Sequence, residues 1–340
     1  MDDKLQSISP EEAVEWYLET RKSEVTDTTL KAHEYRLSHF VRWCGEVEHI
    51  EDLNDLSGVH FNGYKIWRRD DGDLNNVSLA TQLSTLRVFI KWAESIDAVP
   101  RGLHDYISVP TMAPKEDVRS VFLKDDEAAD IQRHLQKFEY ASRNHAVFAL
   151  LWHTGMRTGS LRALDLEDYD SETRSIEVRH RPEEGTPLKN GIMGERHIGL
   201  KDDVDTILSD YIEHTRISTT DEYGRSPIFT TAQGRLAKTT IRNLIYSVTR
   251  PCEYLGTCPH NREIESCEAT QEVHDSSKCP SSVSPHAIRK GAITWARLND
   301  IPVNAVSERM DVSQEVLKKH YDQRTKDEEM ESRRDYFDQL

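Results

Sequence analysis

Four side chains in three separate segments of this 340-residue chain have the chemistry to act together on a phosphate ester. Arg157 lies in a short glycine-containing segment. His286 and Arg289 stand 129 and 132 residues further on, and Tyr321 follows 32 residues after Arg289. A guanidinium group donates paired hydrogen bonds and keeps its charge, so two of them suit a phosphate that gains negative charge in a five-coordinate transition state. A phenol with a pKa near ~10 reacts at neutral pH only beside positive charge, which these arginines and His286 could supply.

These segments resemble the sequence boxes of one enzyme family. Thr154–Leu164, TGMRTGSLRAL, resembles the first arginine box of tyrosine site-specific recombinases, the phage integrase and Xer-like family. His286-Ala287-Ile288-Arg289 matches the family's His-x-x-Arg box, and Tyr321 stands at the place of its nucleophile. The resemblance implies that Tyr321 attacks a DNA phosphorus, forms a 3′-phosphotyrosyl link and releases a 5′-hydroxyl. It also implies that this strand exchange needs neither ATP nor a metal.

The family places a lysine on a β-hairpin after the first arginine box, where it protonates the leaving oxygen. Lys189 is the only lysine between Arg157 and Lys201, and it lies in a turn-rich segment. We therefore assign Lys189 as the general acid. A solvated loop lysine is the alternative for Lys189, and Tyr336 is the rival nucleophile.

Three positions depart from the family's pattern. Ser160 stands where an acidic residue usually follows the first arginine by three, and Lys290 stands where histidine is common. Val312, preceded by Asp311, stands nine residues before Tyr321, where the family has a His or Trp that donates to the phosphate. These departures leave open a catalytically weak or inactive DNA-binding protein of the same fold. A type IB topoisomerase, which shares the chemistry without site preference, is a further alternative.

The elements that must position these residues are mainly α-helical, with a small antiparallel β-hairpin. Capping signals at Ser9 and Ser78 predict the first and fourth helices of a helical domain over residues 1–98. The resemblance identifies it as a SAM-like core-binding domain. Residues 99–118 contain three prolines and predict a linker. Residues 119–325 predict the α/β catalytic domain, with alternating strands over 176–179 and 196–200 around Lys189. Residues 326–340 predict a tail helix.

The charge distribution predicts a DNA partner despite a formal net charge of -16. Four windows contain no Asp or Glu, namely 74–93, 140–164, 223–252 and 276–299. Basic faces on an acidic body are typical of a phosphate-binding groove, although buried helices also lack acidic residues. Contacts with duplex DNA are predicted for Arg87, Lys91, Arg235, Lys238, Arg242 and Lys290. The dispersed acidic residues and the excess of Arg over Lys also favour a family member from a halophilic archaeon, with a mesophile as the alternative.

Four of the five cysteines crowd into a predicted insertion over residues 251–283. They are Cys252, Cys258, Cys267 and Cys279, with His260 among them. Four thiolates in a segment too short for its own core would suit a structural zinc that braces His286 and Arg289. Because no Cys-x-x-Cys pair occurs, reduced thiols or a ligand role for His260 remain alternatives. Cys44 lies on an apolar stripe and is expected in the core.

The sequence also predicts where the protein is located and how it assembles. No apolar run approaches the ~20 residues of a membrane span. The N-terminal segment lacks the basic and apolar regions of an export signal, so a cytoplasmic protein is expected. The resemblance implies a homo-tetramer on two DNA sites at synapsis and a monomer or dimer when free. A metal-dependent nuclease is disfavoured because no carboxylate cluster accompanies the arginine boxes.

Overall fold

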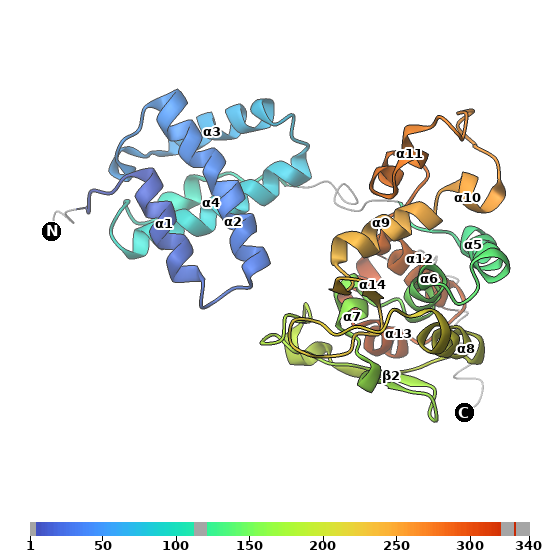
Figure 1. Cartoon of the computed structure of the whole chain (residues 1–340). Coiled ribbons are helices and arrows are strands. Elements are labelled where there is room, and N and C mark those ends of the chain that lie inside the picture. The colour runs from blue at the N-terminus through green and yellow to red at the C-terminus, as the bar shows by residue number, and fades with distance from the viewer. Residues whose placement is uncertain (1–4, 112–120, 321–329, 331–340) are drawn as a thin grey trace. The chain divides into compact units, whose positions relative to one another are not determined.

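The chain divides into two compact units, Met1–Arg119 and Ser120–Leu340 (Figure 1). The computed structural model describes residues 5–111, 121–320 and 330. The protein is mainly helical, with a small antiparallel sheet in the second unit, as the sequence predicts. None of the helices in the described ranges is long and apolar enough to cross a membrane.

The first unit is a bundle of four α-helices joined by short turns. Its elements are α1 (Pro10–Arg21), α2 (Asp27–Trp43), η1 (Cys44–Glu48), η2 (Leu53–Asp55), α3 (Gly58–Asp71), α4 (Asn76–Ser95) and η3 (Leu103–Tyr106). The predicted start of α1 is confirmed, since the Ser9 hydroxyl accepts from the Glu12 amide at 3.2 Å and Pro10 is the first helical residue. The start predicted for α4 is three residues late, because Asn75 caps this helix and accepts from the Ser78 amide at 2.9 Å.

The core of the first unit is rich in aromatic rings. Tyr17, Phe40, Trp43, Tyr64 and Phe89 are all at most 1% exposed, and Cys44 is buried beside them, as expected. Burial of such large rings dominates the stability of a small helical bundle.

The predicted linker over 99–118 begins too early. Val99, Leu103 and Ile107 are buried in the helical core of the first unit. The guanidinium of Arg87 in α4 donates to the carbonyl of Ile107 and ties this segment to the bundle. The helical unit therefore extends through Ile107, because the chain after Pro100 still has apolar side chains to bury.

The second unit surrounds a buried helix. Its elements are α5 (Asp125–Phe138), α6 (Arg143–Thr154), α7 (Thr158–Ala163), η4 (Leu166–Asp168), β1 (Tyr169–Asp170), β2 (Ser175–Val178), η5 (Gly191–Gly194), β3 (Arg196–Gly199), α8 (Asp202–Asp210), η6 (Tyr211–Thr215), β4 (Thr230–Thr231), β5 (Gly234–Arg235), α9 (Lys238–Val248), α10 (Pro251–Leu255), α11 (Glu268–Gln271), η7 (Val273–Lys278), α12 (Pro285–Leu298), α13 (Val303–Met310) and α14 (Gln314–His320). Helix α6 is apolar around its circumference and packs against α5, α8, α9 and α12 (Figure 1). A helix buried on all sides provides a fixed frame for the loops at its ends.

The predicted hairpin is confirmed and belongs to a three-stranded antiparallel sheet. Strand β2 lies between β1 and β3, with Ile176 opposite both Tyr169 and Ile198. Ile176, Val178 and Ile198 point into the core, so alternate positions face outward. Strands β4 and β5 form a separate two-stranded sheet.

Helix α12 is held close to the chain that precedes α5. A Cβ atom at Gly291 would lie 2.1 Å from the Leu123 carbonyl oxygen, and the Leu123 amide donates to the Ala287 carbonyl at 3.2 Å. Only glycine permits this approach. The first turns of α12, which carry His286 and Arg289, are thereby fixed relative to α6.

Candidate active site

Arg157 occupies the turn between α6 and α7. Gly155 ends α6 with a φ of 58°, and its amide donates to the Leu151 carbonyl at 2.9 Å. A Cβ atom at Gly155 would lie 2.7 Å from the Met310 sulfur, so the turn requires glycine for both space and conformation. Arg157 follows as the N-cap residue of α7, and 26% of its side chain is exposed.

Arg289 lies on the buried side of α12 and reaches the same turn. Its side chain donates to the Gly155 carbonyl at 2.7 Å, to the Met310 carbonyl, and to the Asp311 carbonyl at 3.2 Å. The residue is only 4% exposed. The guanidinium is therefore anchored by carbonyl groups of the α6–α7 turn and of the end of α13.

Arg157 and Arg289 meet at Asp311, although they are far apart in the sequence. The Asp311 carboxylate forms an ion pair with the Nη1 group of Arg157, while its main-chain carbonyl accepts from Nη2 of Arg289. The structure thus brings together the two arginines that the boxes single out. Two guanidinium groups held close to each other could bind the oxygens of one phosphate group.

His286 and Lys189 lie within electrostatic range of each other, and His286 also lies within range of the two arginines. His286 lies one helical turn before Arg289 and is exposed. Desolvation of the imidazole by neighbouring groups lowers the pKa of His286, and the positive charges of Arg289, Lys290, Lys189 and Arg157 lower it further. A histidine that senses all four charges is a neutral hydrogen-bond donor at neutral pH rather than a further cation.

The turn that carries Lys189 is tied to the arginine pair by its neighbour. Lys189 is exposed between β2 and β3, and the Asn190 side-chain amide donates to the second carboxylate oxygen of Asp311 at 2.7 Å. Behind this turn, Arg196 donates from Nε to the Arg309 carbonyl at 2.8 Å and from Nη1 to the Gly194 carbonyl at 2.7 Å. The bonds from Asn190 to Asp311 and from Arg196 to Arg309 fix the hairpin to the end of α13.

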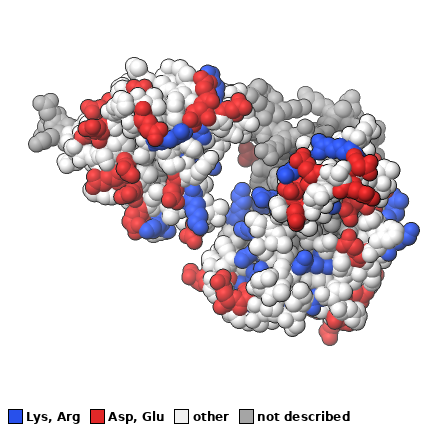
Figure 2. Space-filling view, turned by 45° about the horizontal axis from the view of Figure 1, so that its top comes forward, with Lys and Arg blue, Asp and Glu red and all other residues white. Residues whose placement is uncertain are grey.

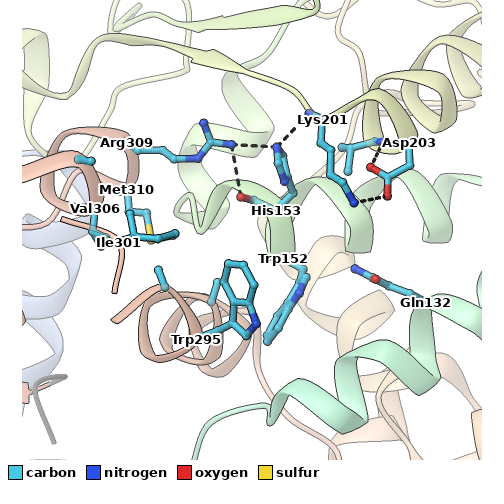
Figure 3. A pocket seen from close by; sticks show the side chains of 14 residues that line it. Gln132, Trp152, His153, Lys201, Asp203, Trp295, Ile301, Val306, Arg309 and Met310 are labelled. Carbon is cyan, nitrogen blue, oxygen red and sulfur yellow. Dashed lines mark hydrogen bonds and ion pairs between the residues drawn. The ribbon is translucent and has the colours of Figure 1, made fainter. Parts of the chain in front are cut away.

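Arg309 ties α13 to the end of α6 and to strand β3. Its side chain also lines a mostly apolar pocket together with Trp152 and Trp295 (Figure 3). The Nη2 group of Arg309 lies 2.9 Å from Nε2 of His153 and donates to the Gly199 carbonyl at 3.1 Å. Burial, followed by the charge of Arg309, lowers the pKa of His153 to about 4. His153 is therefore neutral at pH 7, and its ring nitrogen can accept from Arg309.

This neutral histidine makes stability depend on pH. The unfolded chain binds a proton at His153 below pH ~6.5 but the folded chain does not until about 4, so we expect stability to fall as pH decreases from 6.5 to 4. The loss from this group is on the order of 1 to 2 kcal/mol after solvent screening. His153→Gln, which keeps an acceptor but does not titrate, should flatten that slope in urea unfolding, whereas the exposed His197→Gln should not. Equal slopes for all three proteins would contradict the assignment.

Tyr321 and the rival Tyr336 lie outside the residues that the structure describes. Helix α14 ends at His320, directly before Tyr321. It follows α13 after a short turn at Asp311, Val312 and Ser313.

Two of the three departures from the family's pattern, Ser160 and Val312, lie at buried positions. Ser160 is buried and supplies no carboxylate, and the partner of Arg157 is Asp311 instead. Val312 is 7% exposed and packs with Ile293, Val306 and Leu317, so its role is apolar. Sequence reasoning noted Asp311 only as the neighbour of Val312. The residue type gave one indication of a turn at this position. Asp is among the few residue types that tolerate a left-handed backbone, and Asp311 has a φ of 53°.

Two predicted DNA contacts are corrected by the structure. The side chain of Arg235 is 4% exposed and donates to Asp165 and to Asp221, so it stabilises the fold. Lys290 is buried, with burial lowering its pKa, and does not present its charge at the surface. Arg87 is partly buried by its bond to Ile107.

Lys91, Lys238 and Arg242 are exposed, and their contacts with DNA stay a prediction. A Cβ atom at Gly159 would lie 3.9 Å from the Lys238 ammonium nitrogen, which places Lys238 beside α7 and near Arg157. Figure 2 shows Lys and Arg side chains at one edge of the second unit and at several other places on it, with Asp and Glu side chains gathered among them near the top.

The cysteine-rich insertion packs on α9 without assembling a zinc site. Arg250 anchors it by donating to the Ala269 carbonyl at 2.6 Å. Zinc would require thiolate sulfurs about 3.8 Å apart. Within the described residues, only His134, Glu139 and Glu253 bring three possible ligand atoms within 4.8 Å of one another. The thiols of Cys252, Cys258, Cys267 and Cys279 do not meet in this way, so the predicted zinc site does not fit this arrangement.

Comparisons with known proteins agree with this architecture. Residues 6–95 match the family model described as phage integrase, N-terminal SAM-like domain. No curated protein has significant sequence similarity to the chain. A solved N-terminal domain of a phage integrase/site-specific recombinase from Haloarcula marismortui is 32% identical, with 31% of this chain and 99% of that chain covered and a TM-score of 0.30.

Two solved structures resemble the whole chain. The Tn1549 transposon integrase in complex with a circular intermediate DNA has a TM-score of 0.71 at 15% identity, covering 98% of this chain and 100% of that chain. A lambda integrase dimer bound to a COC′ core site has a TM-score of 0.65 at 13% identity, covering 94% and 79%. At such low sequence identities, these structural likenesses establish the fold alone. The first unit therefore matches the SAM-like domain model of phage integrases, and the fold of the chain is similar to that of the Tn1549 transposon integrase.

Proposed function

We propose that this chain is a tyrosine site-specific recombinase that breaks and rejoins DNA strands through a 3′-phosphotyrosyl intermediate. The observation that carries the proposal is the meeting of Arg157 and Arg289 at one turn, with His286 and Lys189 within electrostatic range. The integrase fold of the second unit adds support.

Each residue has a distinct role in this proposal. Arg157 and Arg289 bind the non-bridging oxygens of the scissile phosphate and stabilise the charge that develops there. His286, kept neutral by its surroundings, donates a further hydrogen bond. The Tyr321 oxygen forms a bond to phosphorus and releases its proton to solvent, while the bond from phosphorus to the 5′-oxygen breaks and Lys189 gives a proton to that oxygen. The phosphate bond energy is retained in the phosphotyrosine, so no ATP and no metal enters the reaction.

The assembly and setting follow from the same proposal. Lys91 in the first unit and Lys238 and Arg242 in the second would contact DNA phosphates. Two DNA sites would be joined by four copies of the chain, which acts in the cytoplasm. The acidic surface would suit a high-salt cell interior. Because salt screens the attraction between basic side chains and DNA phosphates, specific contacts with DNA would have to supply the affinity there.

A non-catalytic DNA-binding protein of the same fold is the second candidate. It is favoured by Val312, whose buried apolar side chain cannot donate to a phosphate. A nicked suicide substrate, from which the cleaved fragment diffuses away, separates the two candidates.

We expect the wild-type protein to form a covalent complex with this substrate, and Tyr321→Phe to abolish it because phenylalanine has no nucleophilic oxygen. Tyr336→Phe is the matched control and should retain the complex. The products are resolved on a denaturing gel. Absence of a complex with wild-type protein, at matched DNA occupancy, would favour the non-catalytic binder.

A further inference from the structure

We infer that Asp311 is the positioning residue that holds Arg157 and the Lys189 turn in the geometry required for strand cleavage. The inference rests on the proposed function and assigns a role that the family's sequence boxes do not contain. It starts from the Asp311 carboxylate, which contacts Arg157 with one oxygen and the Asn190 amide with the other. These two partners belong to the two segments that would bind the phosphate and protonate the leaving group.

The main chain of Asp311 adds a third link. Its carbonyl accepts from Nη2 of Arg289 at 3.2 Å, so a single residue contacts both arginines and the hairpin. Its amide donates to the Glu308 carbonyl at 3.4 Å. Asp311 is the residue at which α13 ends, and its φ is 53°. Three segments that are separate in sequence therefore depend on one turn.

The turn itself is immobilised by packing. Met310 and Val312, on either side of Asp311, are buried in the cluster that joins α12, α13 and α14. The Asp311 side chain is only 12% exposed. A mostly enclosed carboxylate that has a partner on each oxygen, on a backbone fixed by its buried neighbours, is suited to orienting another side chain.

The contacts favour positioning over competition with the phosphate. Asp311 pairs with the Nη1 group of Arg157. Within the described residues, Nε and Nη2 of Arg157 donate no hydrogen bond to a protein group. Those groups remain able to bind a phosphate oxygen. Fixing the guanidinium in advance reduces the ordering that the transition state requires, and misplacement by about 1 Å can cost about 100-fold in rate.

The test compares single-turnover cleavage of the suicide substrate with DNA binding. We expect Asp311→Asn to slow cleavage by about 10- to 100-fold while the dissociation constant for DNA stays unchanged. Asp311→Glu, which keeps the charge, should restore part of the rate. Glu308→Gln removes an exposed carboxylate from the same helix and should cleave like wild type.

A double-mutant cycle shows whether Asp311 acts through Arg157. In an Arg157→Lys background, Asp311→Asn should cost much less than in wild type, because the guanidinium to be oriented is already gone. An equal cost in both backgrounds would overturn the inference. A rate for Asp311→Asn equal to or above that of wild type would also overturn it, the latter indicating a carboxylate that competes with the phosphate.

Two further arms keep the result interpretable. Thermal unfolding reports whether Asp311→Asn folds, and if it does not, Asn190→Ala removes the exposed partner of the same carboxylate and should slow cleavage about two- to tenfold. Unaltered cleavage by Asn190→Ala would then count against the inference. Failure of wild-type protein to form the covalent complex would instead refute the proposed function, and this inference with it.

Discussion

Arg289→Ala is expected to reduce single-turnover cleavage by at least about 10²- to 10³-fold, because under the proposed function it removes a charged donor that stabilises the developing oxyanion. The change should also lower stability, since the carbonyls of Gly155, Met310 and Asp311 lose a buried donor. Cleavage rates, DNA affinity and thermal unfolding should be measured on the same preparations. Arg289→Lys keeps a charge without the paired donors and should remain strongly impaired.

Arg297→Ala provides the matched control for the loss of a buried arginine. Arg297 lies on the same helix, is 4% exposed and donates to the Ile301 carbonyl at 2.7 Å. Its removal should lower stability but leave cleavage by the folded protein near the wild-type rate. If both alanine variants lose activity only in proportion to their unfolded fraction, Arg289 has no catalytic role.

Lys189→Ala is expected to slow cleavage by about 10²- to 10⁴-fold, the range for loss of a general acid. The defect should depend on the leaving group. A substrate with sulfur in place of the 5′-bridging oxygen releases a thiolate, whose conjugate acid has a pKa near ~8.5, so it needs no proton donor. The sulfur substrate should therefore bring Lys189→Ala close to the wild-type rate.

Lys201→Ala serves as the control for charge removal near the hairpin. Lys201 follows β3, is exposed and pairs with Asp203 at 3.0 Å. It should cleave both substrates like wild type. A Lys189→Ala defect of equal size on the oxygen and sulfur substrates would show that Lys189 binds DNA rather than protonating the leaving group.

Local rules predicted much of the fold, and their errors have physical causes. The Ser9-Pro10 signal located the start of α1 because both the cap and the first residue act locally. At α4, Asn75 and Ser78 are both good capping types, and a local rule cannot choose between them. Strand β1 went unpredicted because its two residues are defined by pairing with β2 and not by an alternating pattern of their own.

The sequence boxes indicated which two arginines lie close together, but the sequence did not indicate the tertiary partners of the charged residues. Arg157 and Arg289 could be paired from their boxes, whereas Arg235 looked available for DNA because its sequence neighbours lack acidic groups. Asp165, one of its partners, lies 70 residues away and cannot be seen in a sequence window. Asp311 was missed as a partner of Arg157 for the same reason, since 154 residues separate them.

The most direct measurement is to identify the amino acid and the DNA end in the covalent adduct. Wild-type protein trapped on a suicide substrate would be digested with protease and nuclease, and the modified peptide sequenced by mass spectrometry. The account predicts one peptide, with the oxygen of Tyr321 linked to a 3′-phosphate. A link through Tyr336, a bond to a 5′-phosphate, or free DNA ends cut without an adduct would contradict it.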